Sequence, residues 1–175
     1  GSVSHIGLAI MLIGILFSSG YSSIQSTNYT GLVWNSDFPD EVNNENMLLF
    51  LNEERRIGKY EAKYLGTRKK VENGGGFINA NLLEYIPIIK KYIAKSDFNL
   101  DGNLINENDT IEIDNKDITY FEISFVNGSE EITLFPKVQT DSNSDMIVFS
   151  PDVNNDLLED FYVHVRTYPD PDQEV

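Results

Sequence analysis

The sequence predicts a mainly β fold, a β-sandwich or a partly open β-barrel, preceded by one N-terminal transmembrane helix. Two observations predict it. The stretch from Gly1 to Ser36 carries no formally charged side chain, and residues 6–17 form an unbroken apolar run. The rest of the chain is acidic, rich in Tyr and Phe, and divided into short apolar runs that are typical of strands. A length of 175 residues is enough for one domain with a substantial core.

The composition excludes several classes of function. The net charge of −15 argues against nucleic acid as a partner, because phosphate binding needs clustered Lys and Arg, and it equally opposes a polybasic contact with anionic lipid. The absence of cysteine excludes disulfides, thiolate metal sites and cysteine nucleophiles. An acidic surface would attract a basic or haem-carrying protein partner, although acidity also serves solubility.

Residues 1–21 are expected to form the membrane helix. As a helix, Val3 to Tyr21 would extend roughly 28 Å, and the hydrocarbon core of a bilayer is about 30 Å thick. A cleavable signal peptide would carry a basic stretch before its apolar run, and the sequence shows none. A buried helix of a soluble core would show a polar face, which residues 6–17 lack. A membrane span is therefore favoured over both alternatives.

His5 is the only ionisable residue at the apolar end of the chain before Tyr21. One interpretation is a histidine at the membrane boundary with no specific role. The other is a ligand, because an imidazole inside a bilayer is costly and tends to face a partner, a cofactor or a proton path. Spacing alone leaves both interpretations open.

The remaining chain is expected to divide into three parts. Residues 22–46 are polar, include Trp34 and indicate an extended linker rather than a helix. Residues 47–168 are expected to form the β-rich domain. Residues 169–175 then form an acidic, Pro-rich linker.

Strands are predicted along most of the β-rich domain. Residues 119–126 alternate, so that Phe121, Ile123 and Phe125 share one face, and Asn127-Gly128 is a tight-turn pair. Residues 81–93 are the one helical candidate, but Pro87 equally allows a short turn followed by a strand. The other predicted strands are residues 47–51, 60–65, 132–135, 146–149 and 161–165.

Three patterns resemble functional sites, and each has a simpler structural interpretation. Residues 97–102 imitate the first half of a calcium loop, but Asn108 stands at the twelfth position instead of an acidic residue, so a hairpin turn is favoured. The run from Arg55 to Lys70 holds 7 of the 13 basic residues, and a solvated strand face is favoured over an anion-binding patch. His164 lies in a predicted strand and is by default a structural or surface histidine. The sequence shows no convincing catalytic constellation.

One family resemblance adds to these interpretations. The motif Ser4-His5-Ile6-Gly7-Leu8-Ala9, followed by an apolar helix and then Phe17-Ser18-Ser19-Gly20-Tyr21-Ser22, resembles the late transmembrane segment of CcmF-type cytochrome c biogenesis haem lyase subunits. In that family the segment precedes an outward-facing β-rich domain. The resemblance continues more loosely at residues 46–53, 58–60, 150–152, 160–165 and 169–171.

The resemblance implies that His5 is one of two helix histidines that ligate a membrane-embedded haem b. It implies a protein of the bacterial inner membrane whose soluble domain lies in the periplasm. The implied partners are apocytochrome c and other cytochrome c maturation subunits. The domain would act mainly as a docking and scaffold element for haem attachment to apocytochrome c, without being catalytic or binding a cofactor by itself.

The sequence departs from the family pattern in two respects. Glu159 and Phe161 stand where the family usually has Arg and Leu, so no role of that Arg is carried over. The Trp-rich haem-handling loop of the family is absent, and we expect it upstream, with this chain as a fragment. The alternative is a membrane-anchored cell-envelope β-sandwich that binds a protein or a glycan and has no redox role. A secreted calcium-binding β domain is a third possibility.

Overall fold

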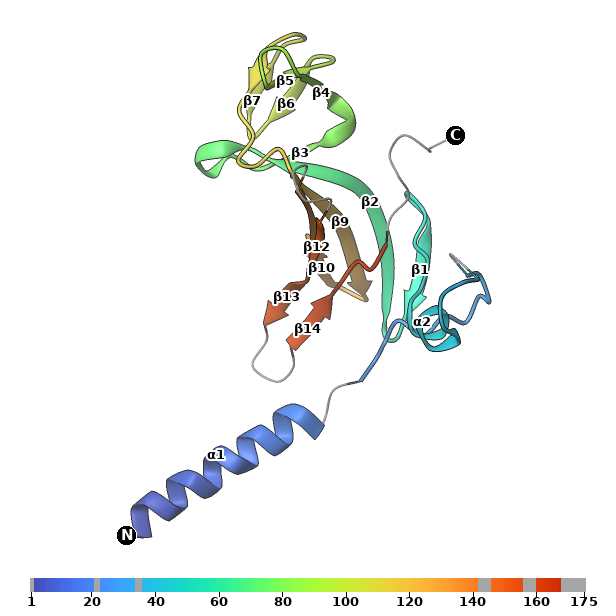
Figure 1. Cartoon of the computed structure of the whole chain (residues 1–175), viewed down its shortest axis with the longest axis vertical. Coiled ribbons are helices and arrows are strands. Elements are labelled where there is room, and N and C mark those ends of the chain that lie inside the picture. The colour runs from blue at the N-terminus through green and yellow to red at the C-terminus, as the bar shows by residue number, and fades with distance from the viewer. Residues whose placement is uncertain (1, 21–22, 34–35, 142–145, 156–159, 168–175) are drawn as a thin grey trace. The chain divides into compact units, whose positions relative to one another are not determined.

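The computed structural model describes residues 2–20, 23–33, 36–141, 146–155 and 160–167 (Figure 1). It divides the chain into two compact units, residues 1–48 and residues 49–175. Each unit is described by itself below. The predicted terminal linker at 169–175 lies outside the described residues.

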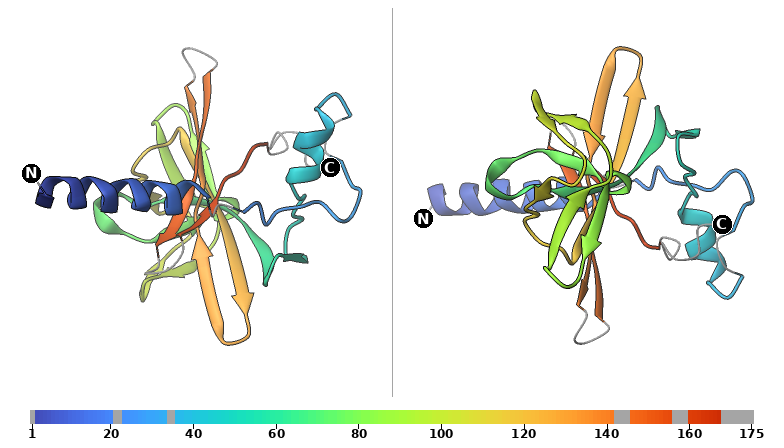
Figure 2. Two further views of the ribbon diagram at one scale, coloured as in Figure 1. Left: turned by 90° about the horizontal axis from the view of Figure 1, so that it is seen from below. Right: turned by 90° about the horizontal axis from the view of Figure 1, so that it is seen from above.

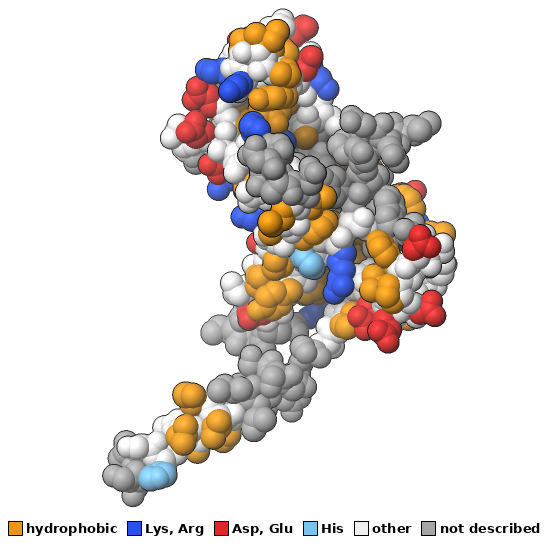
Figure 3. Space-filling model, in the orientation of Figure 1, with side chains coloured by type: hydrophobic (Ala, Val, Ile, Leu, Met, Phe, Trp, Pro, Cys, Tyr) orange, Lys and Arg blue, Asp and Glu red, His pale blue; other side chains and the backbone are white. Residues whose placement is uncertain are grey.

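The first unit contains the predicted N-terminal helix, α1 (Ser2–Gly20). Its described side chains are exposed and mostly apolar; Ile6 and Ile10, for example, are 60% and 65% exposed. Figure 3 shows these hydrophobic side chains along the helix. Among the described residues, however, no helix has the length and apolarity needed to cross a membrane. The helix is confirmed, and the prediction that it spans a membrane is not supported.

The segment after α1 is not wholly extended, so that part of the linker prediction is wrong. A short helix, α2 (Asp40–Glu45), follows Pro39. Proline suits the start of a helix, and two acidic residues, Asp40 and Glu41, occupy the first turn, where they interact favourably with the helix dipole. A hydrogen bond joins the chain before α2 to the end of this helix. The backbone N–H of Asn28 donates to the carbonyl of Asn44 at 2.8 Å.

The second unit is built on one curled antiparallel sheet, which confirms the mainly β prediction in the form of a half-barrel (Figure 1). The strand order is β1-β2-β9-β11-β12; β3 also pairs with β2, and β10 with β9. The register of β9 with β10 continues unchanged into β11, so β10 and β11 act as one long strand interrupted at Phe135-Pro136. The bounds are β1 (Glu54–Ile57), β2 (Tyr60–Lys70), β3 (Phe77–Asn79), β9 (Ile118–Asn127), β10 (Glu130–Leu134), β11 (Lys137–Asp141) and β12 (Met146–Ser150).

The core of this sheet follows the predicted alternation. Phe121, Ile123 and Phe125 of β9 are 4%, 5% and 2% exposed, as predicted for residues on one buried face. Phe125 meets Tyr60 edge-on, with ring centroids 6.3 Å apart, and meets Phe161 at 4.9 Å. Phe161 belongs to the last hairpin, β13 (Asp152–Asn155) and β14 (Asp160–Val163). The hairpin therefore covers part of the buried face of β2 and β9.

Between β3 and β9 the chain forms a smaller layer with its own core. A three-stranded sheet, β4-β5-β8, and a separate two-stranded hairpin, β6-β7, surround the buried residues Ile78, Leu83, Ala94 and Ile111. The helical alternative for residues 81–93 is wrong, because only the 3-10 turn η2 (Ala80–Leu82) forms before two strands. A second 3-10 turn, η1, spans Glu72–Gly74. The bounds are β4 (Leu83–Ile86), β5 (Lys91–Ala94), β6 (Phe98–Leu100), β7 (Asn103–Ile105) and β8 (Thr110–Ile111).

The predicted buried strand at residues 47–51 is also wrong. Phe50 and Leu51 are 45% and 53% exposed, and Leu51 makes only an isolated bridge to Tyr64. Asn52, with φ of 61°, turns the chain at the end of this run, and the N–H of Glu53 donates back to the carbonyl of Phe50. The apolar run therefore ends in a turn and does not continue into β1.

Gly66 marks the irregularity in β2 that accompanies its curvature. The register of β2 with β9 shifts between Tyr64 and Gly66, and Gly66 has φ of 106°. We expect Gly66→Ala to lower the free energy of unfolding by about 1–3 kcal/mol, because side chains rarely adopt this backbone conformation. The cost comes from the backbone conformation, because the added Cβ would make only an ordinary van der Waals contact with Leu51 Cδ1, at 3.5 Å. Urea unfolding followed by circular dichroism measures the change. Unchanged stability would contradict this expectation.

Candidate functional site

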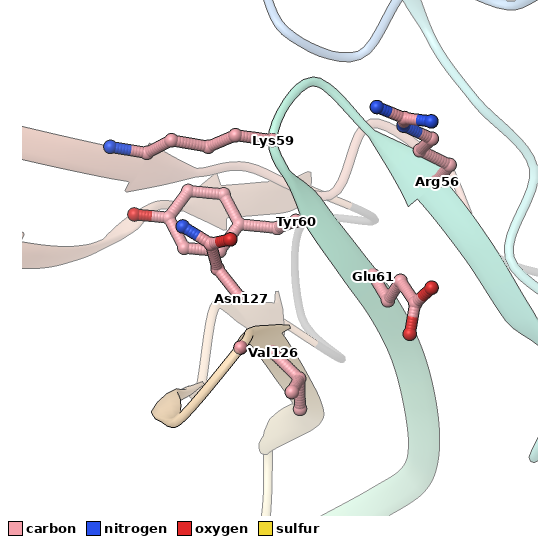
Figure 4. A pocket seen from close by; sticks show the side chains of 7 residues that line it. Arg56, Lys59, Tyr60, Glu61, Val126 and Asn127 are labelled. Carbon is pink, nitrogen blue, oxygen red and sulfur yellow. The ribbon is translucent and has the colours of Figure 1, made fainter.

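An open pocket of about 430 Å³ lies where the β1–β2 turn meets the β9–β10 turn (Figure 4). The turns meet because β2 and β9 are paired side by side, with Glu61 opposite Val126. Gly58 and Gly128, with φ of 58° and 63°, allow the two turns. The Gly128 turn is centred one residue later than the predicted pair, because Asn127 still pairs with Glu130. The lining residues are Arg56, Lys59, Tyr60, Glu61, Val126, Asn127 and Gly128.

The polar groups of the pocket divide into two sets. Lys59, Tyr60 and Asn127 gather on one side in Figure 4, where Lys59 Nζ lies 5.3 Å from the centre of the Tyr60 ring. The side chains of Arg56 and Glu61, cross-strand neighbours of β1 and β2, lie on the other side of the β2 ribbon. An ammonium group, a phenol and an amide can hold a polar or anionic group. They do not form a pair of nucleophile and base.

The basic run from Arg55 to Lys70 does not form one anion-binding patch. Arg55 pairs with Glu53 at 3.1 Å and Lys63 with Glu54 at 3.4 Å, and Arg68 pairs with Glu122. The first two of these pairs are partly or largely exposed and contribute little to stability, whereas the side chains of Arg68 and Glu122 are only 15% and 20% exposed. Arg56 and Lys59 are exposed, as the favoured interpretation of a solvated strand face requires, whereas Arg55, Lys63, Arg68 and Lys70 are only partly exposed.

Lys69, at the far end of β2, is the exception in this run. It is 9% exposed, and its Nζ donates to the carbonyls of Lys116 at 2.9 Å and Ile118 at 2.8 Å and to Thr119 Oγ1 at 3.1 Å. Burial lowers the pKa of Lys69 to about 8, against the opposing effect of Asp117. All three donors are used, so this lysine fastens the start of β9 to β2. It has a structural role.

The two histidines lie in different units. His5 is on α1 and is exposed. His164 follows β14, and its ring meets Phe149 edge-on at 6.3 Å. Burial and the nearby Arg166 lower the pKa of His164 below its usual value. His164 is exposed, and its contacts agree with the structural or surface role expected for it.

The calcium-like motif at residues 97–102 forms a hairpin turn, as favoured. Its acidic side chains accept hydrogen bonds from backbone N–H groups: Asp97 from Glu107 at 2.7 Å, and Asp101 from Gly76 at 3.2 Å. Within the described residues, no three His, Cys, Asp or Glu side chains are grouped closely enough to hold a metal ion. The carboxylates of Asp97 and Asp101 therefore accept hydrogen bonds from the backbone of neighbouring segments.

Comparison with known proteins finds no matching family model, no matching curated protein and no matching solved structure.

Proposed function

We propose that this chain is the outward-facing docking and scaffold domain, with its preceding helix, of a membrane haem lyase subunit that acts in cytochrome c maturation. In this proposal the protein belongs to the bacterial inner membrane, and the β-rich unit lies in the periplasm. Its partners are apocytochrome c and other maturation subunits. The β-rich unit binds proteins and leaves haem attachment to other parts of the machinery.

The observation that carries the proposal is the position of His5 on α1. Its imidazole is exposed on a helix whose described neighbours Ile6 and Leu8 are also exposed and apolar. Such a helix surface suits contact with lipid or with an apolar cofactor, and neutral imidazole is a common axial ligand of haem iron. The residue sequence around His5 supplies the family resemblance. The membrane placement of α1 is itself part of the proposal.

A haem b group fits these residues in one respect. His5 could supply one imidazole ligand to the iron, and the apolar side chains beside it could contact the macrocycle. The second histidine ligand would come from another helix of the full-length protein. When bound, the group would supply electron transfer for haem attachment. The β-rich unit would supply only protein contacts.

We expect His5→Ala in the full-length membrane protein to abolish the b-type haem spectrum. Loss of one of the two histidines that would hold the haem would remove a ligand on which its binding depends. The measurement is the reduced-minus-oxidised visible spectrum of the purified protein at matched concentration. His164→Ala is the matched control, and it should leave the spectrum unchanged. An unaltered spectrum in the His5 variant refutes the ligand assignment.

The pocket favours a second candidate, a cell-envelope binding module without a redox role. Lys59, Tyr60 and Asn127 can hold a polar or anionic ligand, and no catalytic pair accompanies them. The same spectrum separates the two candidates. Full-length wild-type protein without any b-type absorption would favour the binding module.

A further inference from the structure

The turn between β4 and β5 is an apolar tip on the smaller layer of the β-rich unit. It consists of residues 87–90, Pro-Ile-Ile-Lys, and the strand ends on either side of it, Ile86 and Lys91, are paired. Ile88 is 95% exposed and Ile89 is 52% exposed. The right-hand view of Figure 2 looks onto the smaller layer, whose green and yellow-green strands lie in front of the main sheet. The tip therefore presents two large apolar side chains to the surroundings.

Other tight turns of the unit are built from different residues. The connections β1–β2, β6–β7 and β9–β10 are Gly58-Lys59, Asp101-Gly102 and Gly128-Ser129. Glycine and small polar residues suit turns, because they accept the backbone conformation and face water at no cost. Folding therefore does not explain two adjacent isoleucines in the β4–β5 turn, whereas an apolar environment outside the chain does.

Lys90 occupies a backbone position that lysine rarely takes. Its φ is 54°, a conformation that glycine adopts without steric cost. The other non-glycine residues with positive φ in the described chain are all Asn or Asp, which tolerate it better. A lysine kept at such a position indicates that its side chain has a use there.

The ammonium group of Lys90 is available to an external anion. Lys90 is exposed, and in the described part of the chain no acidic side chain pairs with it. Its neighbour Lys91 is different, because its Nζ lies 3.3 Å from Glu112 Oε1. The positive charge of the tip is therefore that of Lys90.

The stretch around the tip differs in charge from the rest of the chain. The chain has a net charge of −15, yet residues 85–96 contain three lysines and no acidic residue. At physiological salt, charges more than about 8 Å away are largely screened. The tip can therefore approach a surface of phosphate groups, although the acidic chain as a whole is unsuited to a polybasic contact with lipid.

Two tyrosines lie behind the tip. Tyr85 and Tyr92 are partners across β4 and β5, their ring centroids are 5.1 Å apart, and both are partly exposed. Tyr85 precedes Ile88 by three residues, which is at most about 11 Å of chain. Tyrosine is enriched where a membrane meets water, because its ring is apolar and its hydroxyl polar. Isoleucines, a lysine and then tyrosines follow the order of acyl chains, phosphates and headgroups.

We propose that the β4–β5 tip inserts into the surface of a phospholipid bilayer. Ile88 and Ile89 enter the boundary of the acyl chains, and Lys90 contacts the lipid phosphates. Interfacial segments bind membranes by burying apolar side chains to this depth. A fluid bilayer closes around a convex tip, whereas a protein partner would need a pocket of matching shape. The inference goes beyond the proposed function, which gives the β-rich unit protein contacts, and it involves no haem.

The test uses the full chain reconstituted into phosphatidylcholine vesicles. Because the chain has no cysteine, Ile88→Cys allows a single environment-sensitive fluorophore to be attached at the tip. Lipids that carry a nitroxide just below the headgroup should quench this fluorophore at least threefold more than one attached through Tyr162→Cys. Tyr162 is the matched control, because it is 63% exposed on β14, which Figure 1 shows at the other end of the unit from β4 and β5. The readout is local, so it does not depend on whether α1 enters the bilayer.

Two further changes, each made in the chain labelled at position 88, test the side chains of the tip. Ile89→Asp should reduce the quenching by at least half, because a carboxylate opposes insertion. Lys90→Gly should also reduce it by at least half, while glycine suits the φ of 54° and leaves the circular dichroism spectrum unchanged. Lys95→Ala is the matched control, because Lys95 is exposed beyond the end of β5, and it should leave the quenching as it was.

Three outcomes would overturn the proposal. Equal quenching at positions 88 and 162 is the result expected if the tip docks into a protein. Quenching that Ile89→Asp or Lys90→Gly leaves unchanged would show that the fluorophore, and not the tip, enters the lipid. Self-quenching between copies labelled at position 88 that exceeds self-quenching at position 162 would make a second copy the occupant. The haem spectrum of the His5 variant is measured separately, so either proposal can fail alone.

Discussion

Phe125→Ala is expected to lower the free energy of unfolding of the β-rich unit by about 3–5 kcal/mol, the range found when a buried Phe is truncated. Phe125 is 2% exposed, and its ring contacts Tyr60 and Phe161 edge-on. Truncation would therefore leave a cavity among β2, β9 and β14. Urea unfolding of the full chain, monitored by circular dichroism, measures this loss.

The neighbouring residue supplies the matched control. Val126 follows Phe125 on β9 but is 37% exposed, so Val126→Ala should cost less than about 1 kcal/mol. A second variant, Phe161→Ala, tests the contact between the last hairpin and the sheet. It should cost less than Phe125→Ala, because Phe161 is only partly buried. Equal losses at Phe125 and Val126 would contradict the assigned buried face of β9.

The buried face of β9 could be predicted because it depends on a local pattern. Phe121, Ile123 and Phe125 alternate with more polar residues. In a strand, such alternation places the apolar side chains on one face. The prediction of a buried strand at residues 47–51 was wrong because it depended on apolar content and not on a pattern of alternation. Apolar content by itself does not reveal whether a segment finds a partner, and Asn52 turns the chain before the run can join the sheet. Burial at such positions is decided by the rest of the fold.

The pocket depends on topology, which one sequence does not reveal. Gly58 and Gly128 are 70 positions apart, and their turns meet only because β2 pairs with β9. The place of residues 146–150 as the last strand in the order of the main sheet is likewise set by topology. From the sequence, residues 146–149 were simply another strand. His5 could be singled out early because a lone imidazole in an apolar run is conspicuous without any fold.

Lys69 shows a different limit of sequence analysis. It lies between two other basic residues, Arg68 and Lys70, in a run for which the sequence favours a solvated strand face. The structure nevertheless buries it, because Lys116, Ile118 and Thr119 provide three acceptors for its ammonium group. The sequence around Lys69 does not indicate those acceptors, because they lie 47 to 50 positions further along the chain. Their effect on Lys69 can be measured through the pH dependence of stability.

Because of Lys69, the free energy of unfolding should rise as the pH increases from about 8 toward 10.5. Its pKa in the folded protein is about 8, below the ordinary value of 10.5, because burial opposes the charged form. Between these two values the unfolded chain binds more protons than the folded chain, so raising the pH favours folding. From pH 8 to pH 9.5 the gain should be about 2 kcal/mol.

The variant Lys69→Met isolates this contribution. It should be less stable than the wild type at high pH, because the buried acceptors around Lys69 lose their donor, and it should lack the rise in stability between pH 8 and pH 9.5. Measurements stay below pH 9.5 because burial raises the pKa of Tyr92, and that shift acts in the opposite direction above about pH 10. Lys91→Met is the matched control, since the Lys91 side chain is 49% exposed and pairs with Glu112. If the wild type and Lys69→Met show parallel pH profiles, the proton on Lys69 is not linked to folding, and its burial does not carry the expected energetic cost.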